Sequence, residues 1–178
     1  MKRPLLLLVL LTFCVTASAQ WIPDQGDGTY RNPILHADYS DPDVIRVGDD
    51  YWMVASSFTT MPGIPLLHSK DLVNWTIVNH IYDRLPHDKY NHPAHGEGSW
   101  APSIRYHKGL FYVYFCTPND GLFVARTKNP LGRWELHQMV DVVKWEDPCP
   151  LWDEDGKAYL VHSIHRGGPA IVHRMSED

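Results

Sequence analysis

Two aspartates, Asp41 and Asp147, each precede a proline at a corner of the chain. The chain has three proline corners of this kind, two with Asp and one with Ala before the proline: Asp-Pro-Asp-Val at 41–44, Ala-Pro-Ser-Ile at 101–104 and Asp-Pro-Cys-Pro at 147–150. If the repeated units are arranged radially, both carboxylates face a common axis. Two carboxylates around a sugar can cleave a glycosidic bond, because one activates a water while another protonates the leaving oxygen. Asp-Pro is also a good turn starter, and spacing alone leaves that interpretation open.

Each corner leads into a predicted hairpin whose turn is rich in Gly and Asp, which favour tight turns. The paired segments are 44–47 with 51–55, 103–106 with 111–115, and 150–152 with 158–162. A second pair follows in the first two units, at 65–71 with 74–78 and at 123–129 with 133–136, and a third copy begins at 171. Four short strands every 45–60 residues are typical of β-propeller blades. The sequence therefore predicts an all-β protein with about two and a half to three blades, fewer than the four that a closed ring needs.

The first 19 residues have the layout of a secretory signal peptide: a basic start, an apolar run at 5–15 and Ala-Ser-Ala before Gln20. That run is too short to span a bilayer, which takes about 20 residues. We expect export to the periplasm or the extracellular space, followed by a lead-in at 20–29 and part of a propeller at 30–178. Without the signal peptide the chain has 14 Lys and Arg against 21 Asp and Glu. This acidic balance disfavours nucleic-acid binding.

Few residues suggest a metal or a disulfide framework. His87, His92 and His95 are spaced by five and three residues, which matches no common zinc site, so no metal is predicted. Cys116 lies in an apolar aromatic run and is expected to be a buried thiol. A single bridge to Cys149 remains open in an oxidising compartment.

Several blocks of the sequence resemble glycoside hydrolase family 43. They include Tyr-Arg-Asn-Pro-Ile-Leu at 30–35, Asp-Tyr-Ser-Asp-Pro-Asp at 38–43, the segment 63–75, Ser-Trp-Ala-Pro-Ser-Ile-Arg at 99–105 and the segment 146–160. The resemblance covers nearly all of the chain after residue 30, in order. It implies a five-bladed β-propeller that hydrolyses xylose- or arabinose-containing polysaccharides with inversion. The block at 62–71 is closer to exo-acting β-xylosidases and α-L-arabinofuranosidases than to endo-arabinanases.

The resemblance also implies roles for individual residues. Asp41 matches the general base and Asp147 the aspartate that raises the pKa of the proton donor. The donor itself is a glutamate of a later blade, beyond Asp178, so the isolated chain is expected to be inactive. Trp100 and Phe58 lie where the family places aromatic side chains against the sugar, although packing between blades is an alternative for both. No cofactor is implied, apart from a central cation held by a later histidine in many members.

Two alternatives to a glycosidase remain. The first is a non-catalytic carbohydrate-binding propeller, and the second is an inactive product of an incomplete gene. Glu97, in the long segment 83–99 between the first two units, could replace the missing acid but is expected to be an ordinary loop residue. The predicted partner in the enzyme and in the binding protein is an oligo- or polysaccharide of the arabinoxylan or arabinan type.

Overall fold

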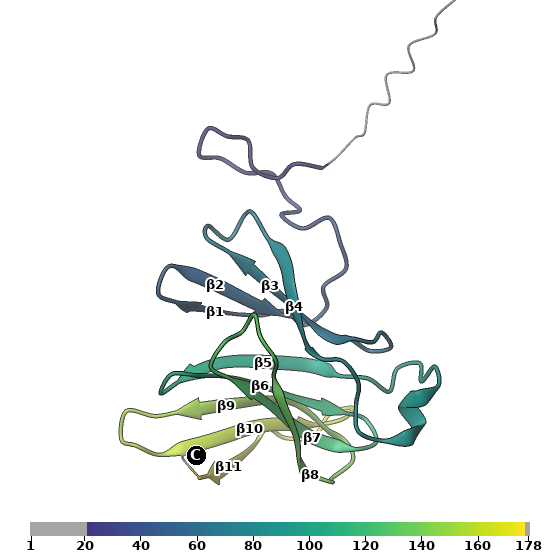
Figure 1. Ribbon diagram of the computed structural model, residues 1–178. Helices are drawn as coiled ribbons and strands as arrows, with labels where there is room; N and C mark the ends of the chain where they lie inside the picture. The colour runs from purple at the N-terminus through teal and green to yellow at the C-terminus, as the bar shows by residue number, and fades with distance from the viewer. Residues whose placement is uncertain (1–20, 177–178) are drawn as a thin grey trace, which may run out of the picture.

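The computed structural model describes residues 21–176, so the predicted signal peptide lies outside the described residues. The described chain is built from β-strands, and its helical content is a short 3-10 helix, η1 (Asp88–Asn91). The strands form three antiparallel sheets that follow one another along the chain (Figure 1). The first sheet consists of β1 (Asp43–Val47), β2 (Asp50–Val54), β3 (Gly63–Ser69) and β4 (Thr76–Tyr82). The second consists of β5 (Trp100–His107), β6 (Leu110–Thr117), β7 (Gly121–Thr127) and β8 (Glu135–Val140). The third consists of β9 (Trp145–Trp152), β10 (Ala158–Ile164) and β11 (Ile171–Met175).

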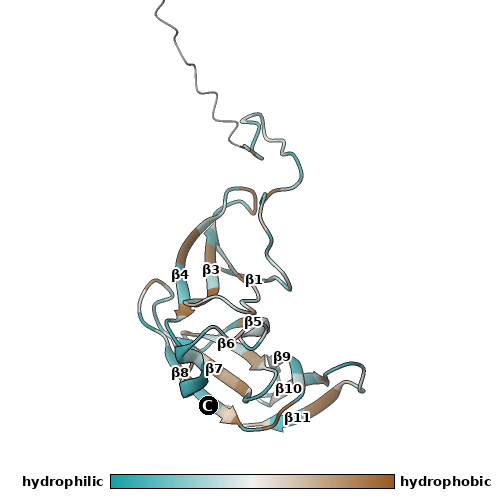
Figure 2. Ribbon diagram, turned by 90° about the vertical axis from the view of Figure 1, so that its right-hand side faces the viewer, coloured by the Kyte–Doolittle hydropathy of each residue, from teal (hydrophilic) through white to brown (hydrophobic). Residues whose placement is uncertain are grey.

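The sheets are arranged like the blades of a propeller. Within each sheet, strands that are consecutive in sequence are neighbours, as in an up-and-down blade. The first strands of the sheets contact in turn, β1 with β5 and β5 with β9, so they form the inner side of the fan. In the view of Figure 2, the hydrophobic segments lie on the strands and most connecting loops are hydrophilic. The predicted strand repeat is confirmed, with two four-stranded blades and three strands of a third.

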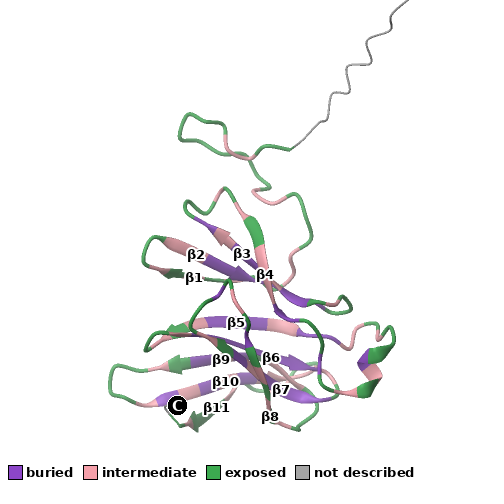
Figure 3. Ribbon diagram, in the orientation of Figure 1, coloured by how far each residue is buried: buried purple, intermediate pink, exposed green. Residues whose placement is uncertain are grey.

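The middle blade holds the core together because its second strand is covered on both faces. Successive side chains of a strand point to opposite faces. Phe111, Val113 and Phe115 of β6 therefore pack in the cluster shared with the first blade. Tyr112 and Tyr114 pack in the cluster shared with the third blade. Figure 3 shows the same burial pattern, with buried residues on the strands between the sheets and exposed residues in the loops.

All three proline corners adopt the same unusual backbone conformation. The residue before proline has φ of 51° at Asp41, 35° at Ala101 and 56° at Asp147, which is the left-handed region. Such a conformation is costly for a residue with a Cβ, and it often marks a functional site. The first corner precedes its strand, as expected. The second and third corners lie inside β5 and β9, contrary to the expectation that every corner comes before its innermost strand. The hairpins of both blades shift register near these corners, so the strands continue past them.

The segment between the first two blades is an ordered connection. It contains η1 and a β-bridge between Ser57 and Ser99 that returns the chain to the first blade. Among residues 21–176, no helix is long and apolar enough to cross a bilayer.

Candidate active site

The carboxylate of Asp41 is held by hydroxyl groups at the end of the first hairpin. Ser56 donates a hydrogen bond of 2.6 Å to Oδ2, and the neighbouring Ser40 donates one of 3.0 Å to the same oxygen. The Ser56 hydroxyl also accepts a 2.8 Å hydrogen bond from the backbone N–H of Ala101 in the second blade. Asp41 is exposed, so its orientation depends on these contacts rather than on packing.

Asp147 occupies the equivalent corner of the third blade and has a perturbed carboxyl group. Partial desolvation, the adjacent Glu146 and, more weakly, Asp41 raise its pKa above the ordinary aspartate value. The hydroxyl of Ser163 lies 3.5 Å from Oδ2 and opposes this shift slightly. The influence of Asp41 means that the structure brings the two predicted acids close enough to interact across the blades.

Ser56 and Ser163 occupy equivalent positions, and the sequence analysis did not single them out. Extending the register two residues beyond the Asp43–Val54 pair brings Asp41 opposite Ser56. In the third blade the register shifts after the Cys149–Val161 pair, so Ser163 is paired with Glu146. The Ser163 hydroxyl still lies 3.3 Å from Glu146 Oε1 and 3.5 Å from Asp147 Oδ2. A regular count outward from the predicted turns therefore does not give the pairing of the third blade.

Aromatic side chains form a wall beside the two corners. The rings of Phe58 and Trp100 meet edge to face with centroids 5.6 Å apart, and Trp100 meets the ring of His165 in the same way at 5.5 Å. Phe58 is 37% exposed, which leaves one part of its ring accessible to a ligand. Backbone hydrogen bonds between the segments of Phe58 and Gly98 fix this wall. A Cβ on Gly98 would lie 2.3 Å from the carbonyl oxygen of Ser57, so no larger residue fits there.

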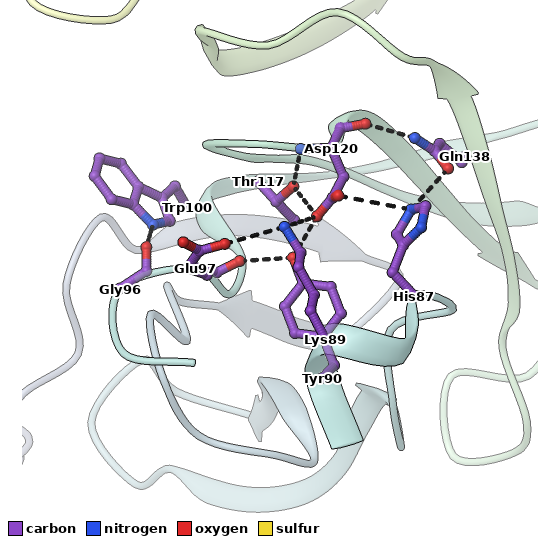
Figure 4. Close-up of polar contacts among 9 residues, drawn as sticks. All are labelled: His87, Lys89, Tyr90, Gly96, Glu97, Trp100, Thr117, Asp120 and Gln138. Atoms are coloured by element: carbon purple, nitrogen blue, oxygen red, sulfur yellow. Dashed lines mark hydrogen bonds and ion pairs between the residues drawn. The ribbon is translucent and has the colours of Figure 1, made fainter. Parts of the chain in front are cut away.

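A polar network anchors the segment that carries Trp100 (Figure 4). The Lys89 ammonium lies 3.0 Å from Glu97 Oε2 and 2.8 Å from Asp120 Oδ2. The Tyr90 hydroxyl donates a hydrogen bond of 2.5 Å to Asp120 Oδ2 and lies 2.9 Å from the backbone carbonyl of Glu97. Beyond them, the indole N–H of Trp100 donates a 2.9 Å hydrogen bond to the carbonyl of Gly96. The indole of Trp100, at the start of β5, is thus held against the loop that this network anchors.

The same network holds the side chains of His87 and Glu97. His87 lies 3.1 Å from Gln138 Oε1 and 3.8 Å from Asp120 Oδ1. Hydrogen bonds from Asn119 and Lys89 lower the pKa of Glu97, which keeps it ionised and makes it a poor proton donor. Within residues 21–176, no group of three or more His, Cys, Asp or Glu side chains is placed to hold a metal ion. His68 of β3 contacts Asp50 Oδ1 of β2 at 2.5 Å.

The arrangement combines two interacting carboxylates, one of them with a raised pKa, and an aromatic wall. An ionised carboxylate held by hydroxyls can accept a proton from water, and a partly exposed ring can stack on the apolar face of a sugar. The site contains Asp41, Asp147, Trp100 and Phe58 together, drawn from all three blades. The glutamate donor, expected beyond residue 178, is not among the described residues.

Comparison with known proteins gives consistent matches. The family described as Glycosyl hydrolases family 43 matches residues 30–178. A putative beta-xylosidase of Xylanibacter ruminicola is 57% identical over 157 residues, which cover 87% of this chain and 29% of that protein. The non-reducing end alpha-L-arabinofuranosidase BoGH43B of Bacteroides ovatus is 38% identical over 148 residues, which cover 78% of this chain and 27% of that protein.

Solved structures show the same fold. The structure described as Bacteroides ovatus Xyloglucan PUL GH43B superposes with a TM-score of 0.70 at 35% sequence identity, and the match covers 82% of this chain and 29% of that one. The chain therefore spans less than a third of the length of these relatives. Its described residues form an all-β part of a five-bladed β-propeller.

Proposed function

The chain belongs to glycosyl hydrolase family 43, and from this premise we propose that it supplies the base-bearing blades of an exo-acting glycosidase. The proposed substrates are xylose- or arabinose-containing plant polysaccharides such as arabinoxylan, from which β-xylosyl or α-L-arabinofuranosyl units are released. The names of the relatives, which include a beta-xylosidase and an alpha-L-arabinofuranosidase, support this substrate class.

In the proposed mechanism Asp41 is the general base. Among the described residues, the hydrogen bonds to its carboxylate fall on Oδ2, which leaves Oδ1 available to a water molecule. Asp41 would take a proton from this water as the water attacks the anomeric carbon from the face opposite the leaving group. The result is inversion, which in such enzymes requires the base and the acid to stand about 6.5–9.5 Å apart.

Asp147 has a different role in this mechanism. A carboxylate near the proton donor raises the donor's pKa, because a like charge disfavours ionisation. The donor would then stay protonated near neutral pH and deliver its proton to the leaving oxygen. The donor is a glutamate that the remaining blades would supply. The chain alone is therefore expected to be inactive.

The aromatic wall would position the terminal sugar. The exposed part of Phe58 and the indole of Trp100 offer apolar surfaces beside Asp41, and sugars present apolar C–H faces to such rings. We also propose that the protein is exported through the predicted signal peptide, because the proposed polysaccharide substrates occur outside the cytoplasmic membrane. No cofactor takes part in the proposed reaction.

The observation that carries the proposal is the mutual approach of Asp41 and Asp147 beside the aromatic wall. It can be tested with a hybrid enzyme in which residues 20–178 of this chain replace the matching segment of the Xylanibacter ruminicola relative. Release of 4-nitrophenol from the aryl β-xyloside or the aryl α-L-arabinofuranoside is the expected result. A folded hybrid that hydrolyses neither compound, while the relative itself hydrolyses one, would contradict the exo-glycosidase proposal.

A carbohydrate-binding protein without activity is the second candidate, because Glu97, the acid of this chain that could replace the proton donor, has a lowered pKa. The two functions differ in their response to Asp41→Asn in the hybrid. An enzyme loses turnover and keeps its affinity for xylo-oligosaccharides. A binding protein shows no turnover before or after the change.

A further inference from the structure

The corner of the middle blade carries no acid, yet its strand contacts both of the corners that do. β5 lies between β1 and β9, and it contains the left-handed Ala101 near its start. The Ser103 hydroxyl donates a 2.6 Å hydrogen bond to the carbonyl of Pro148, the residue immediately after Asp147. On the other side, the backbone N–H of Ile104 donates a 2.8 Å hydrogen bond to Asp43 Oδ2.

The side chain of Arg105 contacts both neighbouring blades. Its Nη1 lies 2.5 Å from Oδ2 of Asp43, two residues after Asp41. Its Nη2 lies 2.8 Å from Sγ of Cys149, two residues after Asp147. The same Nη1 also donates to the carbonyl of Ile104 at 2.6 Å, which fixes the guanidinium against its own strand. One planar group thus connects equivalent positions of the first and third blades.

The chemistry of this link depends on the guanidinium. Its two terminal nitrogens are held at a fixed separation by a rigid plane, whereas a lysine ammonium is a single point on a flexible stem. Burial by itself would lower the pKa of Arg105, but the carboxylate of Asp43 and the sulfur of Cys149 outweigh burial and raise it. The group therefore stays charged, and its side chain is only 30% exposed.

We propose that Arg105 is a positioning residue that sets the separation between the Asp41 and Asp147 corners. This inference rests on the proposed function, in which these two carboxylates act on the same substrate. Two like charges repel one another, so the corners separate unless the neighbouring structure resists. Arg105, with Ser103, supplies that resistance from the blade between them.

Measurable consequences follow for both acids. A displacement on the order of 1 Å can reduce turnover about 100-fold, because the attacking water is no longer aligned. The pKa of Asp147 also reports the separation, since Asp41 contributes to raising it. The other causes that act on the Asp147 pKa are burial, which is the largest, Glu146 on β9, which also raises it, and the hydrogen bond from Ser163 on β10, which lowers it.

The test compares Arg105→Lys with the parent hybrid enzyme. Lysine keeps the positive charge but replaces the two-nitrogen fork of the guanidinium, Nη1 and Nη2, with a single nitrogen. Only the geometry of the link therefore changes. We expect kcat to fall about 10- to 100-fold with little change in KM, and the pKa of Asp147 to move down towards the ordinary aspartate value. That pKa is measured by NMR titration of protein labelled with carboxyl-¹³C aspartate, with Asp147→Asn to assign the signal. Arg126→Lys is the matched control, because Arg126 is an exposed arginine whose ion pair with Glu135 lies on the outer strands of the same blade.

A second pair of variants covers the case in which Arg105→Lys does not fold. Cys149→Ala removes one acceptor of the fork, and we expect a smaller change of kcat and of the Asp147 pKa in the same directions. Cys149→Ser restores an acceptor and should reverse the change. Unaltered kcat and Asp147 pKa in a folded Arg105→Lys or Cys149→Ala protein would overturn the proposal. If the parent hybrid has no activity, the proposed function fails separately, and the Asp147 pKa still decides whether Arg105 sets the separation.

Discussion

The hydroxyl of Ser56 lies 2.6 Å from Oδ2 of Asp41 and donates a hydrogen bond to it. The same hydroxyl accepts a 2.8 Å hydrogen bond from the backbone N–H of Ala101, so it uses its donor towards the carboxylate and an acceptor site towards the second blade. The carboxylate of the first blade is therefore oriented by the backbone of the second.

Removing the Ser56 hydroxyl should reduce catalysis without abolishing it. In the hybrid enzyme, we expect Ser56→Ala to lower kcat about 10-fold, because the carboxylate of Asp41 remains but loses the shorter of its two orienting hydrogen bonds. Asp41→Asn should lower kcat by at least about 1000-fold, since it removes the base itself. Initial rates on the preferred aryl glycoside measure both. A Ser56→Ala enzyme as active as the parent would show that this bond does not orient the base.

The aromatic wall should act mainly on substrate binding. We expect Phe58→Ala and Trp100→Ala each to raise KM for xylo-oligosaccharides about 5- to 10-fold, which corresponds to about 1–1.4 kcal/mol of stacking. Leu131→Ala is a suitable control, because Leu131 is 60% exposed in a loop of the second blade away from the wall. An unchanged KM together with a lower melting temperature would assign both rings to packing between blades instead.

The repeat of strands could be predicted from the sequence because the turn chemistry is local. Gly48, Gly109 and Gly156 all have positive φ in the tight turns where the hairpins were expected. The sequence predicts that the corners at Ala101 and Asp147 come before their strands, whereas in the structure β5 and β9 continue through these corners. The residue before a proline ordinarily adopts an extended conformation, not a left-handed one. Rules based on local sequence therefore predict that a strand begins after each corner, whereas in the structure the corner interrupts a strand.

The two acids and the aromatic pair could be proposed from the sequence, but the residues that hold them could not. Ser56 and Ser163 follow from hairpin register, which is uncertain where a hairpin shifts. Arg105 meets Asp43 only because the blades are packed radially, and 62 residues separate the two in the chain. The contacts of Lys89 with Asp120 join a loop without periodicity to the turn of another blade, so no pattern in the sequence indicates them.

The two cysteines should differ sharply in reactivity. Cys116 is 1% exposed, and its burial, with a smaller effect from Asp147 and Glu146, raises its pKa to about 12. Cys149 is partly exposed, and both thiols are free. In the reduced hybrid protein at pH 8, compared with its Cys116→Ala and Cys149→Ala variants, we expect Ellman's reagent to modify Cys149 and to reach Cys116 only after denaturation. Rapid reaction of Cys116 in the folded protein would contradict the packing between the second and third blades.

The Lys89 network should stabilise the protein at neutral pH and lose its effect in acid. Burial alone would raise the pKa of Asp120, but hydrogen bonds from Lys89 and Tyr90 outweigh it and lower that pKa, and the pKa of Glu97 is lowered as well. A carboxyl group whose pKa is lower in the folded state binds a proton more tightly when unfolded, so protonation favours unfolding. The stabilisation is complete above the unfolded values of about 4 and is lost as the pH falls below them.

Lys89→Met removes the cation that both carboxylates share. We expect it to lower the free energy of unfolding of the hybrid enzyme by about 1–2 kcal/mol at pH 7, since Lys89 and Glu97 are partly exposed while Asp120 is buried. Because Asp120 and Glu97 lose the partner that lowers their pKa values, the melting temperature of the variant should fall less between pH 5 and pH 3 than that of the parent. Lys128→Met, at an exposed lysine of the second blade, is the control and should follow the parent at every pH. Parallel melting curves for the Lys89→Met protein and the parent across this pH range would exclude the ion network as the source of the acid sensitivity.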